Sequence, residues 1–438
     1  MGRVATGLLC LGLLSTGACV CEVPAASTAT VDSTTLTLAQ AESTAISNQP
    51  RLLAAQLRTR ASSQRIREAR SGLLPTVVFN ATGVRVADTG ASTAAGAITT
   101  SAISDRFAYG GNLVQLVTDF GRTSALIGTE RSLTDAQKDE ETLTGAQIRL
   151  NVRRTYFQVM GAEAVLRAAR EAQANRRLIS KQISVLAQSQ LRSTLDVNFA
   201  NVLESEAELA VVRAESMVQQ QRAHLASAMG EPQPITALLT EEALPPELPP
   251  DATSFLAQAL AQRADLSAAI SLEHAAERFA TAEKRLSYPT LNVIGTAGQS
   301  PYHDHTLHDD YAAIGFNLNI PVFNSGLFAA RRSEAEFEAR ARTKDVDEAN
   351  LEVTEQVRNT WYQANEAYRS LDVSARLVTQ SREALRLAQA RYEAGLGSIV
   401  ELNEAQLSET SAEITAAGAN YDYLTRRAEL DYAAGLLN

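Results

Sequence analysis

The side chains best suited to metal chemistry lie in one short segment of the chain. Three histidines are interspersed with three aspartates between residues 303 and 310. Imidazole and carboxylate groups together suit Zn, Cu or Ni. Their spacing matches no closed site, and short histidine-rich tracts in exposed loops are commonly only solvated. The sequence therefore predicts no bound metal and no cofactor, and it leaves three candidate ligands, His303, His305 and His308.

Two acidic residues, Glu401 and Glu404, stand three apart and so share one face of a predicted helix. Carboxylates gathered in this way attract cations and can set the selectivity of a pore. The alternative is a solvated helix start. Just before them, Gly395 and Gly397 resemble part of a phosphate-binding loop, but no strand precedes them and no Lys-Ser/Thr pair follows. We interpret that segment as a turn.

The sequence supports no catalytic site. It contains no HExxH motif and no arrangement of Ser, His and Asp that can be argued to form a triad. His224 and His274 stand singly in helical stretches, where a surface or packing role is the default. The net charge of −10, a pI near 5.2 and the lack of a basic stripe exclude nucleic acid as a partner. We therefore predict that the protein is not an enzyme.

Residues 1–26 are typical of a secretory signal, with Arg3 ahead of a short apolar run. Small residues then precede Cys19, which makes Cys19 a candidate for lipidation. Thr16 occupies the place where a lipobox usually has Leu, so ordinary cleavage just before Cys19 or near residues 24–26 stays the alternative. All cysteines lie within the first 21 residues, so we expect no disulfide in the body of the chain.

The C-terminal half of the chain repeats the N-terminal half at an offset of 205 residues. The motif Val-Arg-x-Thr-Tyr-x-Gln at Val152 returns as Val-Arg-x-Thr-Trp-x-Gln at Val357. Six prolines between residues 232 and 250 form a stiff boundary. A duplication of this length predicts two similar structural units. The predicted segments are a signal at 1–26, repeat 1 at 27–231, a linker at 232–250 and repeat 2 at 251–438.

Each repeat has the same predicted order, which is a helix, two strands and a very long helical stretch. The first helices cover 36–72 and 252–287, and each ends before a Pro-Thr pair. Large apolar residues alternate with small or polar ones in the segment Ile314-Gly315-Phe316-Asn317-Leu318-Asn319-Ile320. That pattern is typical of a strand between lipid and water, and no later segment is apolar enough to span a bilayer as a helix. The strands are predicted at 76–86, 107–119, 290–297 and 311–322.

The long helical stretches carry a narrow apolar seam. From residue 122 to about 190 the chain would extend roughly 100 Å as a helix. Apolar residues recur there at steps of three and four, typical of a coiled coil, and repeat 2 keeps the same steps. Breaks near 192–195 and 394–398 predict tight reversals. Each break is followed by an acidic residue suited to a first helical turn, Asp196 or Glu401.

With these elements in place, the chain resembles the TolC family of bacterial outer-membrane channel-tunnels over nearly all of both repeats. No single sequence marker is specific to this family, but the occurrence of the markers in the same order in both repeats is highly specific. The markers are Leu74-Pro75-Thr76 and Tyr288-Pro289-Thr290, the strand exits Thr118-Asp119-Phe120-Gly121-Arg122 and Pro321-Val322-Phe323-Asn324-Ser325-Gly326, and Arg391-Tyr392-Glu393-Ala394-Gly395 leading to Val400-Glu401-Leu402-Asn403-Glu404-Ala405.

The resemblance implies a mainly α fold with a small β part. Each protomer would supply long antiparallel coiled-coil helices and four strands. Three protomers, as a homotrimer, would close a 12-stranded β-barrel in outer-membrane lipid, continued by an α-helical barrel in the periplasm. The implied function is the passive exit duct of a tripartite efflux pump or type I secretion system. The alternative is a periplasmic coiled-coil scaffold or adaptor without channel activity, which would have no use for amphipathic strands.

The resemblance also implies partners and site residues. A periplasmic adaptor (membrane fusion) protein and an inner-membrane transporter of the RND, ABC or MFS type would open the periplasmic tip. Tyr392 matches a tyrosine that holds the tunnel shut, but its arginine partner falls at Gly397, so that lock is absent or replaced. Glu401 and Glu404 match acids that ring the constriction, and Asp196 a tip aspartate. The tip and gate residues are Asp196, Tyr392, Gly395, Gly397, Glu401 and Glu404.

Overall fold

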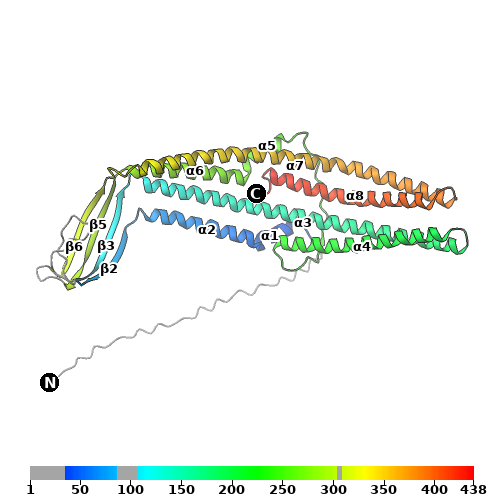
Figure 1. Ribbon diagram of the computed structural model, residues 1–438, viewed down its shortest axis with the longest axis horizontal. Coiled ribbons are helices and arrows are strands. Elements are labelled where there is room, and N and C mark those ends of the chain that lie inside the picture. Colours follow the sequence, from blue (N-terminus) through cyan, green and yellow to red (C-terminus); the bar gives the residue numbers. More distant parts are fainter. Residues whose placement is uncertain (1–34, 86–105, 303–307) are drawn as a thin grey trace, which may run out of the picture. The chain divides into compact units, whose positions relative to one another are not determined.

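The computed structural model describes residues 35–85, 106–302 and 308–438. The predicted signal at 1–26, Cys19, and two candidate metal ligands, His303 and His305, lie outside these residues. The described residues belong to one compact unit, in which the long strands gather at one end of the helices (Figure 1).

The two halves of the chain have matching element orders. Repeat 1 contains β1 (Thr35–Leu36), α1 (Leu38–Asn48), α2 (Pro50–Ser71), β2 (Thr76–Val84), β3 (Arg106–Thr118), α3 (Arg122–Gln188) and α4 (Thr194–Met229). The linker contains β4 (Leu238–Leu239), which pairs in parallel with β1. Repeat 2 contains α5 (Thr253–Gln262), α6 (Ala264–Lys284), the 3-10 turn η1 (Arg285–Ser287), β5 (Thr290–Tyr302), β6 (Asp310–Asn319), α7 (Leu327–Glu393) and α8 (Ile399–Ala433).

The first helix of each repeat is broken in two, so the prediction of single helices at 36–72 and 252–287 was wrong. In repeat 1 the break lies at Gln49 (φ −69°, ψ 114°), because Pro50 disfavours helical backbone in the residue before it. In repeat 2 Arg263 takes the same conformation (φ −67°, ψ 125°) without a proline. Its guanidinium instead forms an ion pair with Asp265 and donates to Gln356 Oε1 at 2.6 Å.

The four long strands form one antiparallel sheet in the order β2-β3-β5-β6 (Figure 1). All four were predicted, with ends that differ from those observed. β5 runs beyond the predicted residue 297 to Tyr302, because it pairs with both β3 and β6. β6 ends at Asn319, ahead of Pro321, whose nitrogen has no hydrogen to donate to a neighbouring strand.

The long helices form two antiparallel hairpins, α3 with α4 and α7 with α8, which contact each other through α3 and α8 (Figure 1). α2 packs on α3, and α6 packs on both α3 and α7. The row α2-α3-α6-α7 therefore follows the strand order of the sheet. α3 and α7 have 67 residues each, or about 100 Å. Among the described residues, no helix carries an apolar stretch long enough to cross a membrane.

The predicted apolar seam is the core of the helical part. Val152, Tyr156 and Val159 on α3 are fully buried, as is Val357 on α7. The Tyr156 hydroxyl lies 2.9 Å from the carbonyl oxygen of Leu36 and 2.8 Å from that of Thr240. This contact fixes the β1–β4 pair against the middle of α3, because a buried hydroxyl needs a hydrogen-bond partner.

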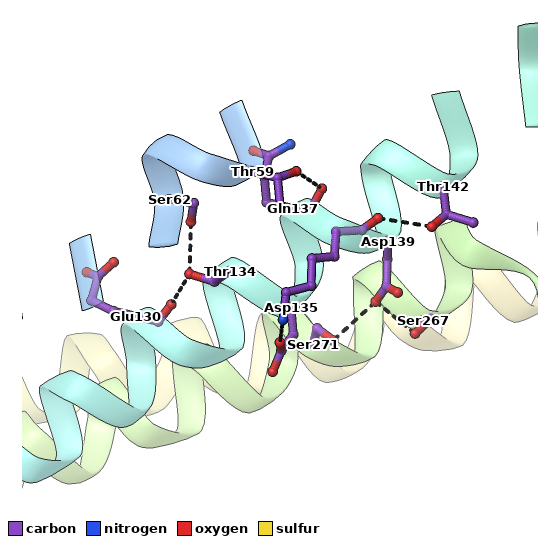
Figure 2. A network of polar contacts seen from close by, with 11 residues as sticks. Thr59, Ser62, Glu130, Thr134, Asp135, Gln137, Asp139, Thr142, Ser267 and Ser271 are labelled. Atoms are coloured by element: carbon purple, nitrogen blue, oxygen red, sulfur yellow. Dashed lines mark hydrogen bonds and ion pairs between the residues drawn. The ribbon is translucent and has the colours of Figure 1, made fainter. Parts of the chain in front are cut away.

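Nearer the sheet, small polar side chains join α2, α3 and α6, as Figure 2 shows. The buried hydroxyls of Ser62 on α2 and Thr134 on α3 lie 3.0 Å apart. Oδ2 of Asp139 on α3 accepts a hydrogen bond from Ser267 on α6 at 2.8 Å, and Ser271 lies 3.5 Å from the same oxygen. The two repeats therefore meet through paired polar groups at this level.

Candidate functional site

The sheet has two chemically different faces, which the strand register fixes. Val293 lies opposite Phe316, and Ile314 follows on the same face of β6. Ile314 and Phe316 are 83% and 76% exposed. On the other face Asn292 lies opposite Asn317. The alternation predicted for this strand is confirmed, and it suits a sheet with hydrocarbon on one side and water on the other. The apolar face continues through Val77, Phe79, Leu113 and Leu318.

Both predicted reversals are present, at the end of the hairpins away from the sheet (Figure 1). Gln190 has φ 58° in the turn between α3 and α4, and Gly395 has φ 77° in the turn between α7 and α8. A side chain at Gly395 would strain this backbone. A Cβ at Gly397 would lie 3.2 Å from the Cβ of Arg391. Gly395 and Gly397 are therefore turn residues, as the sequence indicates.

Arg192 and Tyr392 join the two reversals, and we call this contact the tip link. Nη2 of Arg192 donates to the carbonyl oxygen of Tyr392 at 2.5 Å. The guanidinium carbon lies 4.2 Å from the centroid of the tyrosine ring, where the π-face attracts a cation. Position 397, where the resemblance places the arginine partner of the tyrosine, is glycine. An arginine of repeat 1 contacts the tyrosine instead.

The Tyr392 side chain makes its contacts through the ring. It is only 5% exposed and packs in a cluster with Ile183, Ile399 and Leu402. Its hydroxyl has no hydrogen-bond partner in the described part of the chain. Burial raises the pKa of Tyr392, and the negative charge of Asp196 adds to the rise. The phenol is therefore neutral at physiological pH.

The three predicted acids of the tip differ in their surroundings. Ser193 and Asp196 form a capping box, in which the Ser193 hydroxyl accepts from the Asp196 amide at 3.2 Å. The Glu401 carboxylate lies 3.2 Å from Nε of Arg391. Glu404 is exposed and has no ion pair among the described residues. Within one chain, the negative charge of Glu401 is therefore balanced by Arg391, whereas no described residue balances the charge of Glu404.

An apolar groove of about 820 Å³ opens beside the tip link, and we call it the tip groove. It lies between the ends of α3 and α7, with Leu402 of α8 also in its wall. Leu191 lines it and is 67% exposed, and Leu396 on the other reversal is 75% exposed. The remaining apolar lining includes Ile179, Ile183, Val185 and Leu186.

Further from the tip, a charged cluster connects α7 and α8. Nη2 of Arg382 lies 2.6 Å from Glu413, and its Nε lies 3.9 Å from Glu409. Burial raises the pKa of Glu409 to about 7, and the hydrogen bond and charge of Glu413 add to the rise. Sequence reasoning missed this cluster. The sequence signal for it was the pair Glu409 and Glu413, which stand four residues apart on a helix that also has buried side chains.

The predictions about metal ions and lipid stay predictions. His308 is exposed, and nowhere in the described ranges do three His, Cys, Asp or Glu side chains gather as metal ligands. His303, His305 and Cys19 lie outside those ranges.

Comparison with known proteins places these features in a wider group. A family model described as Outer membrane efflux protein matches residues 42–231 and 255–436. The outer membrane protein TolC of Escherichia coli (strain K12) is 24% identical over 412 residues, which are 86% of this chain and 78% of that protein. TolC of Salmonella enteritidis is 24% identical over 318 residues, 69% of this chain, and the match spans 62% of that relative.

A solved structure shares the arrangement of hairpins and sheet. The outer-membrane channel OprN superposes with a TM-score of 0.77 at 20% sequence identity, and the match covers 91% of this chain and 89% of that one. A likeness at this level of identity shows the fold. The mainly α fold with a small β part is therefore confirmed.

Proposed function

This chain belongs to the outer membrane efflux protein family, and on that premise we propose that three copies form a channel-tunnel. The tunnel is the passive exit duct of a tripartite efflux pump or a type I secretion system. The observation that carries the proposal is the amphipathic four-stranded sheet. Its chemistry suits a membrane, and it continues directly into the helices α3 and α7, each about 100 Å long.

The edges of the sheet support assembly with further copies. β2 and β6 each pair on one side only within the described chain. In lipid every backbone N–H and C=O group needs a partner, so an open edge is not tolerated. If β6 of one copy pairs with β2 of the next, three copies close a barrel of 12 strands. Its apolar face then meets lipid and its asparagine-bearing face meets the lumen.

The internal repeat supplies a template for the helical part of the same interface. Within the chain α3 packs on α6, where Oδ2 of Asp139 accepts from Ser267 and the Gly128 carbonyl accepts from Arg278 Nη1 at 3.1 Å. By the repeat, α7 corresponds to α3 and α2 corresponds to α6. The equivalent contact therefore forms between α7 of one copy and α2 of the next.

Exposed apolar side chains stand where this second contact requires them. In the alignment of the repeats, Leu57 of α2 corresponds to Ser271 of α6. Phe337 of α7 corresponds to Ser132 of α3, which is buried. Leu57 and Phe337 are 62% and 66% exposed in a single chain. Large exposed apolar groups at equivalent positions support burial by a neighbouring copy.

The tip is the proposed site for partners. An adaptor protein docks at the reversals and the tip groove, and together with an inner-membrane transporter it opens the duct. The exposure of Leu191 and Leu396 supports this placement, since apolar side chains at the tip of a rod need a cover. The transporter supplies the energy, because a duct of this kind is a conduit and not an enzyme.

The proposed gate combines the tip link with a ring of acids. Arg192 and Tyr392 hold the two reversals of one copy together. Three copies bring Glu401 and Glu404 into a ring that attracts cations, with Asp196 at the neighbouring reversal. Release of the tip link lets the hairpins separate and widens the passage.

The N-terminal and domain assignments are also part of the proposal. Residues 1–26 act as a secretory signal, Cys19 is a candidate lipidation site, and residues 232–250 link the repeats at 27–231 and 251–438. Such a signal directs the protein out of the cytoplasm.

Reconstitution of the purified protein tests the proposal. We expect heat-modifiable trimers in the outer-membrane fraction and discrete single-channel conductance in planar bilayers. A soluble monomer without conductance would overturn the duct and leave the alternative, a periplasmic coiled-coil scaffold.

A further inference from the structure

A cavity of about 210 Å³ lies between the two hairpins, where α3, α7 and α8 meet. Neither Arg192 nor Tyr392 lines it, so it is separate from the tip link. Much of the lining is polar, although the surrounding helices pack mainly through small and apolar side chains. The polar lining residues are Asn175, Arg176, Gln182, Gln389, Gln406, Glu409 and Thr410.

Two of these side chains are buried, and each has one donor atom without a hydrogen-bond partner among the described residues. Arg176 on α3 is 7% exposed and Gln406 on α8 is 5% exposed. Nη1 of Arg176 and Nε2 of Gln406 have no hydrogen-bond partner in the part of the chain that the structure describes. A guanidinium stays charged in proteins, and a buried charge without a partner is strongly unfavourable. Both unpaired atoms are donors, so each needs an acceptor that the surrounding side chains do not supply.

The carboxylates around the cavity do not fill this role by direct contact. Glu409 on α8 and Glu206 on α4 attract Arg176, but among the described residues neither forms an ion pair with it. Glu409 is engaged by the Arg382 guanidinium of α7 and by Glu413. The charge of Glu171 on α3 acts on the same arginine, Arg382 of α7. Among the residues that line the cavity itself, the charged ones are Arg176 and Glu409.

We propose that this cavity binds a small inorganic anion, held by the guanidinium of Arg176 and the side-chain amide of Gln406. Charged donors form the stronger hydrogen bonds to anions, and the volume accommodates an anion with several waters. Arg176 belongs to repeat 1 and Gln406 to repeat 2, so the bound anion joins the two hairpins.

Anion binding is linked to the protonation of Glu409. When Glu409 is ionised, its negative charge repels the anion and already attracts the positive charge of Arg176. When Glu409 is protonated, it is neutral and does not repel the anion. The pKa of Glu409 is raised to about 7, so this competition changes near neutral pH. The anion therefore binds more tightly at pH 6 than at pH 8.

Thermal unfolding of the full-chain protein in detergent tests the site. Chloride is exchanged for the bulkier gluconate at constant ionic strength, and Tm is measured at pH 6 and pH 8. We expect Tm to be higher in chloride by about 1–2 °C at pH 6 and by less at pH 8. An equal Tm in both salts at both pH values would mean that the cavity holds only water, and it would overturn the proposal.

Neighbouring arginines provide a matched pair of variants. Arg176→Gln should abolish the difference between the two salts, and Arg177→Gln, at the exposed next position, should retain it. Loss of the difference in both variants would assign the chloride effect to general surface charge and contradict the site. Should Arg176→Gln fail to fold, anomalous diffraction from bromide-soaked crystals of the unaltered protein decides, because only a bromide peak beside Arg176 supports the site.

These results are independent of the proposed duct. Conductance and trimer formation are measured on the same preparation, and they require no anion in the cavity. A failure of the anion site therefore leaves the proposed function standing, and the reverse also holds.

Discussion

The guanidinium of Arg192 lies 4.2 Å from the centroid of the Tyr392 ring, and its Nη2 donates to the Tyr392 carbonyl oxygen. The two residues are 200 positions apart in the sequence and belong to different repeats. Because Gly397 leaves the second reversal without the expected arginine, the first reversal supplies the cation. The contact therefore holds one hairpin to the other at the tip.

Removal of the arginine should favour the open tip. Arg192→Ala removes a cation–π contact and a charged hydrogen bond, together about 2 kcal/mol. A gate that is rarely open would then open roughly 30-fold more often. Single-channel recording in planar bilayers measures this, with Arg177→Ala on the preceding helix α3 as a control. Unchanged open probability in Arg192→Ala would rule out the tip link as part of the gate.

Substitutions at Tyr392 should distinguish the contribution of the aromatic ring from that of the hydroxyl group. Tyr392→Phe keeps the ring under Arg192 and removes a hydroxyl that has no partner among the described residues, so stability and conductance should stay close to those of the unaltered protein. Tyr392→Ala should lower the free energy of unfolding by about 3 kcal/mol, since it empties a buried site. Denaturant titration compares the two. A large effect of Tyr392→Phe would show that the hydroxyl matters.

The acids of the tip should contribute unequally to ion selectivity. Glu404 has no ion pair among the described residues, whereas Glu401 is compensated by Arg391. Glu404→Gln should therefore reduce the cation preference more than Glu401→Gln does, and the double variant most of all. The reversal potential in a KCl gradient measures the preference, with the exposed Glu355→Gln, distant from the tip, as control. Unchanged selectivity in the double variant would remove the acid ring from the mechanism.

Trimer assembly should depend on Leu57 and not on its neighbour. Leu57→Glu places a charge in the proposed contact between α2 and α7 of the next copy, and we expect a dissociated or heat-labile trimer. Arg58→Glu, the control at the next, exposed position, should leave the trimer intact, because neighbouring side chains on a helix point about 100° apart. Gel mobility of unheated samples measures the outcome. Equal effects of both variants would contradict the α2–α7 interface.

Stability should fall as pH rises through neutrality because of Glu409. Its pKa is raised from an ordinary value of 4.5 to about 7 in the folded chain. The folded state therefore retains the proton more strongly than the unfolded state, and the stabilisation is complete below pH 4.5 and lost as pH rises through 7. Glu409→Gln removes this pH-dependent contribution to stability. The difference in Tm between the variant and the unaltered protein should therefore change with pH between 5 and 8. A constant difference would mean that Glu409 has an ordinary pKa.

The polar packing near the sheet gives a further prediction. Thr134→Val keeps the shape of the side chain but leaves the buried hydroxyl of Ser62 without its partner (Figure 2). We expect the free energy of unfolding to fall by about 1–3 kcal/mol. Thr142→Val, on the exposed side of the same helix, should change it by less than about 0.5 kcal/mol. Chemical denaturation followed by circular dichroism measures both, and equal effects would contradict the role of the Ser62–Thr134 contact.

Much of the fold was predictable because its signals are local. Pro75 and Pro289 mark the ends of helical segments, and the alternation around Phe316 marks β6. The break at Gln49 was also readable, because Pro50 follows it. The break at Arg263 was not readable, since it depends on an ion pair with Asp265 and on bonds to residues far along the chain.

The candidate site was predictable only in part. The reversals and Gly395 follow from turn chemistry, which a few consecutive residues determine. The sequence indicated that the arginine was missing at Gly397, but it did not identify Arg192 as the replacement. It also gave no direct sign that Arg176 and Gln406 are buried at one cavity.

The sequence by itself determined the repeat, the order of the elements and the two faces of the sheet. Periodicity, proline and glycine act within a few residues, so they need no knowledge of distant parts. Only the tertiary structure decided which residues of the two hairpins meet. The relative position of two long helices depends on all the side chains packed along them at once. That packing sets Arg192 over Tyr392 and places Arg176 and Gln406 around one cavity.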